Sequence, residues 1–585
     1  MRGGNYDKTP FVEIAGHHGE VWKGYDNVLV ELKNRMSTLD KKREIIIIDC
    51  YPGVLYEELK RELIDGLAPE LLFFTDEEIF RSAQEITDRI KDRMTSDRVF
   101  GQMCLEKYED LVRPGAMEAV RDKIERTEGV VVIYGAGARM VCQPDIYIYA
   151  DMARWNLQLR LRSNRIRNWK NALNYTDNLM KFKWGYFFEW RIADRHKKKH
   201  FEELDYILDT NIEEMPKMMS GNAFRDGLRQ AARRPFRVVP FFDPGVWGGQ
   251  WMKQVCGLDA KEKNYAWCFD CVPEENSLML KLDGELLEIP SLDLVLRHPR
   301  ELLGDKVYAR FGAEFPIRFD FLDTWDGQNL SLQVHPLVSY IQDKFGMHYT
   351  QEESYYILDA KEDSHPVVYL GLKNGVQKED FLNALEKAQD AKFPFDAEKY
   401  VNRISVKKHD HVMIPPGTVH CSGKNTMVLE ISSTPYIFTF KLWDWGRVGL
   451  DGKPRPIHLE HGKEVIQFER DTDFVERELI HQEKTILKEE GHETELTGLH
   501  KLELIESRRE WFTHKIKCQT QDSVNVLNLV EGEEVTVESV DGSFAPFKVH
   551  YAETFIIPEV VKEYWLVPQE NIRTGVVCAR VRTWN

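Results

Sequence analysis

The chain has 585 residues, of which 42% are hydrophobic, and its formal net charge is −17 at neutral pH. This length predicts several domains with sizeable cores, and the acidic balance argues against nucleic acid as a partner. No apolar run is long enough to cross a membrane and the polar start lacks the apolar core of a signal peptide, so we expect a cytoplasmic protein without a membrane partner.

The N-terminal part, residues 1–235, has the pattern of an α/β domain. Two continuous β-branched runs, at 44–49 and 129–135, are typical of strands in a parallel sheet that is covered on both faces. Helical stretches over 76–94 and 107–127 separate these runs. The order of strand, helices and strand favours an α/β fold.

The loop after the first strand lacks the residues of a phosphate-binding P-loop. A P-loop needs a second glycine and then Lys and Ser or Thr, so that backbone N–H groups and an ammonium surround the phosphates. Here Gly53 is followed by Glu57 and Glu58. The strand-like segment 144–152 and the basic stretch Arg154–Arg167 resemble the third strand and the lid helix of nucleotide or uridine kinases. We therefore predict a P-loop-kinase-like α/β domain without kinase activity, with a structural or nucleotide-sensing role.

Four residues in the middle of the chain have the character of a metal site without cysteine. Gln333 and His335 lie two positions apart in the strand-like segment Leu-Gln-Val-His-Pro, so strand alternation places both side chains on one face. Glu353 lies in a second alternating segment, and His420 ends Pro-Pro-Gly-Thr-Val-His. Nitrogen and oxygen ligands without thiolates suit zinc or another divalent ion in an open, catalytic site within a β-barrel. The alternative is four ordinary interior residues, each of which would need a buried partner.

The motifs around these residues resemble, in order, those of class I mannose-6-phosphate isomerases, which are zinc-dependent enzymes of the cupin superfamily. Gly-Val-Trp-Gly-Gly (245–249) and Phe-Pro-Ile-Arg-Phe-Asp-Phe-Leu-Asp (315–323) precede the Gln-x-His strand as in that family. Gly-Leu-Lys-Asn-Gly-Val-Gln-Lys-Glu-Asp-Phe (371–381) is similar to its helical insertion, and residues 406–420 are similar to its metal-closing hairpin. The resemblance covers residues 236–585, and several motifs in one order are more specific than any one alone.

The resemblance implies a bicupin, a pair of all-β barrels, after the α/β domain. A metal-binding barrel is expected over 236–460 with a helical insertion near 371–400, and a charged linker helix and a metal-free barrel over 461–585. The charged segment 456–500 is expected to be the helical link between the two barrels. Alternating segments at 523–534 and 553–560 favour the second barrel. The implied function is zinc-dependent isomerisation of mannose 6-phosphate and fructose 6-phosphate through an enediol. The expected partner is a small phosphosugar, and nothing indicates the oligomeric state.

The resemblance also implies the residues around the substrate. Glu430, in the family's Glu-Ile position, is the expected group for proton transfer, and Lys441 stands near the place of a catalytic arginine. Arg318, Gln351 and Arg447 are the expected substrate-binding residues.

Two substitutions in this set keep other functions open. Gln351 and Asp320 stand where relatives carry lysine, and an uncharged amide cannot act as a proton donor in catalysis. One alternative is a regulatory protein that binds a sugar phosphate without converting it. Another is a metal-dependent isomerase of a different phosphosugar.

Overall fold

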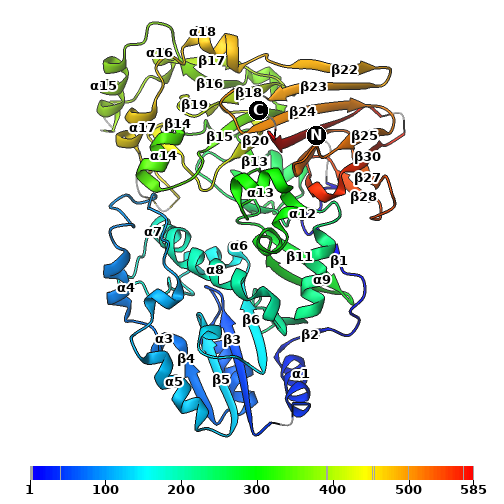
Figure 1. Ribbon diagram of the computed structural model, residues 1–585. Helices are drawn as coiled ribbons and strands as arrows, with labels where there is room; N and C mark the ends of the chain where they lie inside the picture. Colours follow the sequence, from blue (N-terminus) through cyan, green and yellow to red (C-terminus); the bar gives the residue numbers. More distant parts are fainter. Residues whose placement is uncertain are drawn as a thin grey trace. The chain divides into compact units, whose positions relative to one another are not determined.

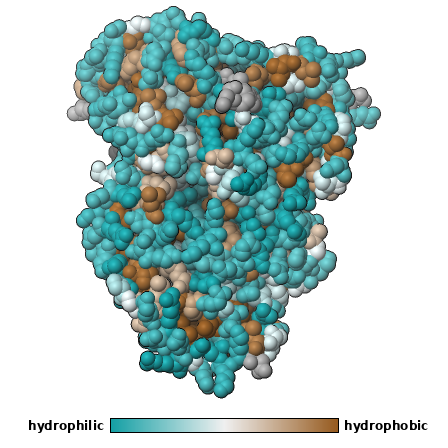
Figure 2. All heavy atoms as spheres, in the orientation of Figure 1, coloured by the Kyte–Doolittle hydropathy of each residue, from teal (hydrophilic) through white to brown (hydrophobic). Residues whose placement is uncertain are grey.

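The structure is a computed structural model that describes residues 4–39, 41–389, 393–450, 452, 455–498, 500–570 and 572–583. The chain forms two compact units. The barrel unit consists of Met1–Pro10, Ala232–Pro273 and Pro299–Asn585, and the N-terminal unit consists of Phe11–Ala231 and Glu274–His298. None of the helices that the structure describes is long and apolar enough to span a membrane. The face drawn in Figure 2 is largely hydrophilic, with scattered hydrophobic residues.

A seven-stranded, mostly parallel sheet is the centre of the N-terminal unit (Figure 1), with the order β2-β8-β7-β6-β3-β5-β4. Its strands are β2 (Val21–Lys23), β3 (Arg43–Cys50), β4 (Leu71–Phe74), β5 (Gly129–Gly135), β6 (Ile146–Asp151), β7 (Tyr206–Asp209) and β8 (Lys217–Ser220). β3 to β7 run parallel, and β8 and β2 add an antiparallel edge. The strands predicted at 44–49, 129–135 and 144–152 are confirmed as β3, β5 and β6. Ile46, Ile47 and Ile48 of β3 and Val131, Val132 and Ile133 of β5 are fully buried, as expected for a sheet covered on both faces.

The helices of this unit are shorter than predicted. They include α1 (Tyr25–Ser37), α3 (Thr75–Glu78), α4 (Ala83–Ile90), α5 (Ala116–Glu125), α6 (Arg154–Arg162), α8 (Trp190–His200) and α9 (Gly221–Ala231). Within the predicted helix 76–94, a capping box of Ser82 and Glu85 starts a new helix, α4. Within 107–127, Gly115 has a φ of 74° and caps α5, so the preceding residues cannot continue the same helix.

Residues 274–298 belong to the N-terminal unit although they follow the start of the barrel unit in the sequence. β11 (Ser277–Leu282) and β12 (Glu285–Pro290) form a three-stranded sheet with β1 (Val12–Glu13), in which β1 is parallel to β11. α11 (Leu292–Arg297) follows. The predicted linear division after residue 235 did not include this exchange, because it depends on pairing between segments far apart in the chain.

Buried charges lie at the carboxyl end of the parallel sheet. The Nζ atom of Lys197, in α8, lies 2.8 Å from both carboxylate oxygens of Asp151, which ends β6, and 2.8 Å from Oδ1 of Asp293. Nε2 of His196 lies 2.9 Å from Oδ2 of Asp49, near the end of β3. Ligands of open α/β sheets usually bind at this edge. Here the chain's own side chains pair there, which favours a structural role; the kinase resemblance stays a prediction.

Asp76, at the start of α3, gives this unit a testable pH dependence. Burial raises the pKa of Asp76 to about 6 from its ordinary 3.8, although the Trp169 indole N–H donates to its Oδ1 at 2.9 Å. A carboxyl whose pKa is raised by folding contributes stability below its unfolded pKa and loses it as pH rises through the folded pKa. The substitution Asp76→Asn keeps the acceptor for Trp169 and should raise the free energy of unfolding at pH 8 by about 3 kcal/mol. Urea unfolding should show this gain shrinking toward pH 4; a gain independent of pH would contradict the assignment.

Two sheets form the first barrel of the barrel unit, with the orders β18-β15-β20-β13-β10-β9 and β17-β16-β19-β14-β21. The first contains β9 (Phe241–Asp243), β10 (Trp267–Cys271), β13 (Arg318–Asp323), β15 (Glu352–Ala360), β18 (His411–Ile414) and β20 (Thr426–Ser433). The second contains β14 (Leu332–Val334), β16 (Val367–Leu372), β17 (Val401–Ser405), β19 (His420–Ser422) and β21 (Phe440–Trp443). Helix α15 (Lys378–Ala388) lies between β16 and β17 in the sequence, where the helical insertion was predicted.

The second barrel has a six-stranded sheet, β22-β23-β24-β31-β26-β29, and a four-stranded sheet, β25-β30-β27-β28. Its strands are β22 (Lys484–Glu489), β23 (His492–Gly498), β24 (Ile505–Phe512), β25 (Ile516–Gln519), β26 (Asn525–Glu531), β27 (Glu534–Ser539), β28 (Phe547–His550), β29 (Thr554–Ile557), β30 (Glu563–Pro568) and β31 (Thr574–Val581). Only part of the predicted charged linker is helical, and another part forms strands. α17 (Leu459–Val465) is helical, but 484–498 form a hairpin that turns at Gly491, where φ is 75°.

Candidate metal centre and substrate site

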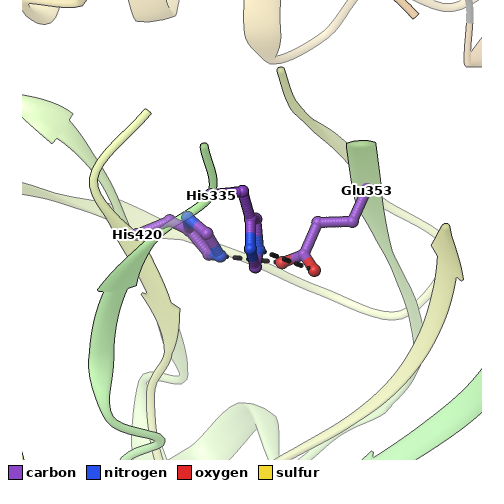
Figure 3. A group of neighbouring side chains, drawn as sticks. All are labelled: His335, Glu353 and His420. Carbon is purple, nitrogen blue, oxygen red and sulfur yellow. Dashed lines mark ion pairs between the residues drawn. The ribbon is translucent and has the colours of Figure 1, made fainter. Parts of the chain in front are cut away.

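Three side chains converge inside the first barrel (Figure 3): His335, directly after β14, Glu353 on β15 and His420 on β19. Nε2 of His335 lies 2.9 Å from Oε2 of Glu353, and Nε2 of His420 lies 2.7 Å from its Oε1. All three side chains are at most 1% exposed. Their ligand atoms lie within 4.8 Å of one another, a spacing that could hold one metal ion.

Backbone carbonyls fix both imidazole rings in the form that binds a metal. Nδ1 of His335 donates to the carbonyl of Phe438 at 2.9 Å, and Nδ1 of His420 donates to that of Thr418 at 2.8 Å. A carbonyl can only accept, so each Nδ1 carries a proton and each Nε2 is directed at the centre. Such bonds orient histidine ligands in metalloproteins.

The remaining polar atoms of the cluster also fit a divalent ion. Among the described residues, the buried Nε2 of His335 and Oε1 of Glu353 have no hydrogen-bond partner outside the cluster itself. Burial alone would raise the pKa of the Glu353 carboxyl, but His335 and His420 hold it well below its usual range. A carboxylate and two imidazole Nε2 atoms directed at one point are a donor set suited to zinc or a similar ion.

Gln333 lies at the edge of this cluster. Its Nε2 is 3.2 Å from Nε2 of His420, and the two residues are opposite one another in the pairing of β14 with β19. The two ends of an amide have nearly the same shape, so a half-turn of this group directs its oxygen toward the centre. The structure thus brings all four predicted ligand residues together.

Gln351 supports Glu353 in this structure. Its Nε2 donates to Oε2 of Glu353 at 3.0 Å, and its Oε1 accepts a hydrogen bond of 3.0 Å from the backbone N–H of Phe438. Both ends of the amide are therefore committed, in contrast to the predicted substrate-binding role. The Phe438 backbone thereby orients two ligands: its N–H donates to Gln351, which binds Glu353, and its carbonyl accepts from His335.

Strand register places two inward-facing rows beside the cluster. Across β13, β20 and β15, Arg318 is opposite Ser432 and Ser432 is opposite Glu353, so their side chains share the face that carries the metal ligand. The Arg318 side chain is 6% exposed and makes no hydrogen bond or ion pair with any described residue. A buried, unpaired guanidinium is a strong site for an anion.

The next row contains Asp320, Glu430 and Tyr355, which are again opposite one another in the sheet. Burial, Asp320 and then Glu353 raise the pKa of the Glu430 carboxyl well above its usual range. Tyr355 Oη has no hydrogen-bond partner among the described residues. Sequence reasoning had not included Tyr355, although its position two residues after Glu353 indicates the same strand face.

The other two predicted residues differ in their surroundings. Lys441 is opposite Gln333 in the pairing of β14 with β21, which places it on the same face as the cluster. Arg447 is committed elsewhere: its Nη1 donates to the Asn329 carbonyl at 2.7 Å and its Nη2 pairs with the Asp444 carboxylate. Both terminal nitrogens of Arg447 are therefore occupied in this structure, in contrast to its predicted substrate-binding role.

Comparisons with known proteins agree with this division of the chain. A domain family of unknown function matches residues 24–233. Mannose-6-phosphate isomerase ManA of Bacillus subtilis is 27% identical over 250 residues, 43% of this chain and 72% of that protein. The probable mannose-6-phosphate isomerase GmuF of the same organism is 28% identical over 232 residues, 40% of this chain and 68% of that protein.

A solved structure of the Bacillus subtilis mannose 6-phosphate isomerase aligns with a TM-score of 0.49 and 17% identity, over 59% of this chain and 99% of that one. The sequence matches support an enzyme of the isomerase class.

Proposed function

We propose that the barrel unit is a metal-dependent aldose–ketose isomerase that interconverts mannose 6-phosphate and fructose 6-phosphate through an enediol. The observation that carries the proposal is the pair of histidines whose Nδ1 protons are fixed on backbone carbonyls beside Glu353. The similarity to curated mannose-6-phosphate isomerases supplies the substrate class.

We assign the metal to Gln333, His335, Glu353 and His420, with zinc as the expected ion. A divalent ion bound there would polarise the sugar oxygens at which negative charge develops. Arg318, buried and unpaired among the described residues, is the proposed partner of the phosphate group, since a guanidinium grips phosphate with two parallel hydrogen bonds.

The proton transfer is assigned to Glu430 together with Asp320. Two carboxyl groups opposite one another in a buried row cannot both ionise easily, so one of them keeps a proton. The ionised group can remove the proton from carbon and the protonated group can donate one to oxygen, as acid and base pairs do in other enzymes. Asp320 would then supply part of what a lysine supplies in relatives.

The substitution Glu430→Gln tests this assignment. It should lower the turnover of mannose 6-phosphate by about 100-fold or more, the usual contribution of a general acid or base, while the metal content stays unchanged. Fructose 6-phosphate formation and metal analysis measure both quantities. Glu362→Gln, an exposed residue after β15, is the matched control and should leave both unchanged. Full turnover in Glu430→Gln would remove Glu430 from the mechanism.

A second candidate is a protein that binds a phosphosugar without converting it. The commitment of Gln351 to Glu353 and Phe438 favours it, because no ammonium stands in the place of the relatives' lysine. Protein with stoichiometric metal that binds fructose 6-phosphate but converts neither hexose phosphate would favour this role. Conversion of another phosphosugar instead would identify the remaining alternative, an isomerase of different specificity.

A further inference from the structure

The second barrel contains a cavity of about 310 Å³ between its two sheets. The walls come from the inward faces of β23, β24, β26 and β31 on one side and of β25 and β30 on the other. β22 and β25 are edge strands of their sheets and also contribute to the lining. The volume is at the lower end of the range for small-molecule sites.

The inward positions of this barrel change from apolar to charged along the strands. Register places Leu529, Val576 and Phe512 toward one end, and this part of the barrel is a packed hydrophobic core. Toward the other end, Asn525 is opposite Arg580, and Leu527 and Arg508 are both opposite Cys578. A barrel that serves only as a structural partner would be expected to fill these positions with apolar side chains, because buried polar groups are costly.

Asn525 carries an unused acceptor in the cavity wall. Asn525 is 2% exposed. Its Nδ2 donates to the Gln519 carbonyl at 3.2 Å and to Tyr564 Oη at 3.1 Å. The Gln519 carbonyl can only accept, which fixes the orientation of the amide. Oδ1 of Asn525 is therefore left buried without a hydrogen-bond partner among the described residues. A hydroxyl group of a ligand would satisfy it.

Arg508 supplies a positive charge to the same cavity. Its Nε donates to Oε1 of Glu506 at 2.6 Å, and Nη2 of Arg580 binds the same oxygen at 2.6 Å. Two guanidinium groups thus share one carboxylate oxygen. The terminal nitrogens of Arg508 make no hydrogen bond with a described residue, so they can take a carboxylate or phosphate.

Glu510 and the apolar lining complete the set of contacts. Nε2 of His492 lies 2.9 Å from Oε2 of Glu510, whose carboxylate adds acceptors to the wall. Leu527 and Leu566 line the cavity and can pack on the carbon skeleton of a ligand. We propose that the second barrel is a binding site for a small polyhydroxylated anion, a sugar phosphate or a sugar acid. This site is independent of the metal centre in the first barrel and of any reaction there.

Calorimetric titration of the full chain with fructose 6-phosphate, with and without a metal chelator, tests the proposal. We expect one binding event that survives chelation and that Arg508→Gln weakens at least tenfold, which is the usual loss for a charge-assisted hydrogen bond. Cys518→Phe, which fills the cavity from β25, should abolish this event. Arg573→Gln is the matched control, since the Arg573 guanidinium lies over the Trp511 ring and is not part of the lining.

Titration with gluconate, inorganic phosphate and sorbitol separates the ligand classes. Tighter binding of gluconate than of fructose 6-phosphate would identify a sugar acid, and the reverse would identify a sugar phosphate; each supports the site. Chelation-resistant binding that is unchanged in both Arg508→Gln and Cys518→Phe would overturn the proposal, as would the absence of such binding for every probe. Arg318→Gln should leave the chelation-resistant event intact, so failure of the proposed isomerase activity does not affect this result.

Discussion

Replacement of His420 by alanine should remove the divalent ion and reduce isomerisation to the level of the metal-free protein. His420 is fully buried, its Nδ1 is fixed by the Thr418 carbonyl, and its Nε2 faces Glu353 at 2.7 Å. Loss of residues that merely orient a ligand lowers metal affinity about 10- to 100-fold, so loss of a ligand should exceed that range. Metal content after dialysis and fructose 6-phosphate formation are the two measurements.

The matched control is His481→Ala, at an exposed position of the same unit. It should keep both metal and activity. His420→Gln provides a second variant that retains side-chain volume, in case the alanine variant folds poorly. Stoichiometric metal in a folded His420 variant would rule out the assigned ligand set.

The second large effect is expected from Lys197→Ala in the N-terminal unit. Lys197 is 2% exposed and pairs with Asp151 and Asp293, both of which are also buried. Removal of one partner of a buried pair leaves an uncompensated charge and costs about 3 to 5 kcal/mol. Urea unfolding of the full chain should show a loss of this size in the transition of the N-terminal unit.

Two further variants separate this effect from loss of packing. Lys198→Ala, at the exposed neighbouring position on α8, should change the free energy of unfolding little. Addition of Asp151→Asn to Lys197→Ala should recover part of the loss, because the stranded carboxylate is gone. A loss below 1 kcal/mol in Lys197→Ala would show that water reaches the pair.

The metal centre was accessible to sequence reasoning because each ligand is part of a local pattern. Alternation in β14 and β15 indicates on which face Gln333, His335 and Glu353 lie. The hydrogen-bond partners of Gln351 and Arg447 could not be predicted from such local patterns. Gln351 depends on the backbone of Phe438, and the free ends of Arg447 are taken by a loop carbonyl and by Asp444.

The fold shows the same limit. Continuous β-branched runs predicted β3 and β5 correctly, since such runs have few alternatives to a doubly covered sheet. The hairpin at 484–498 was read as helix, because its charged residues suit an exposed helix or an exposed strand equally well. The pairing of β1 with β11 has no local signal at all.

That pairing also constrains how the protein can be made and divided. The N-terminal unit needs residues up to His298, and the barrel unit includes Met1–Pro10, so no single cut in the chain yields two whole units. During synthesis the ribosome must pass the first strands of the barrel unit before β11 and β12 exist to pair with β1. A fragment that ends near residue 235 therefore lacks part of the N-terminal unit, and the complementary fragment lacks part of the barrel unit.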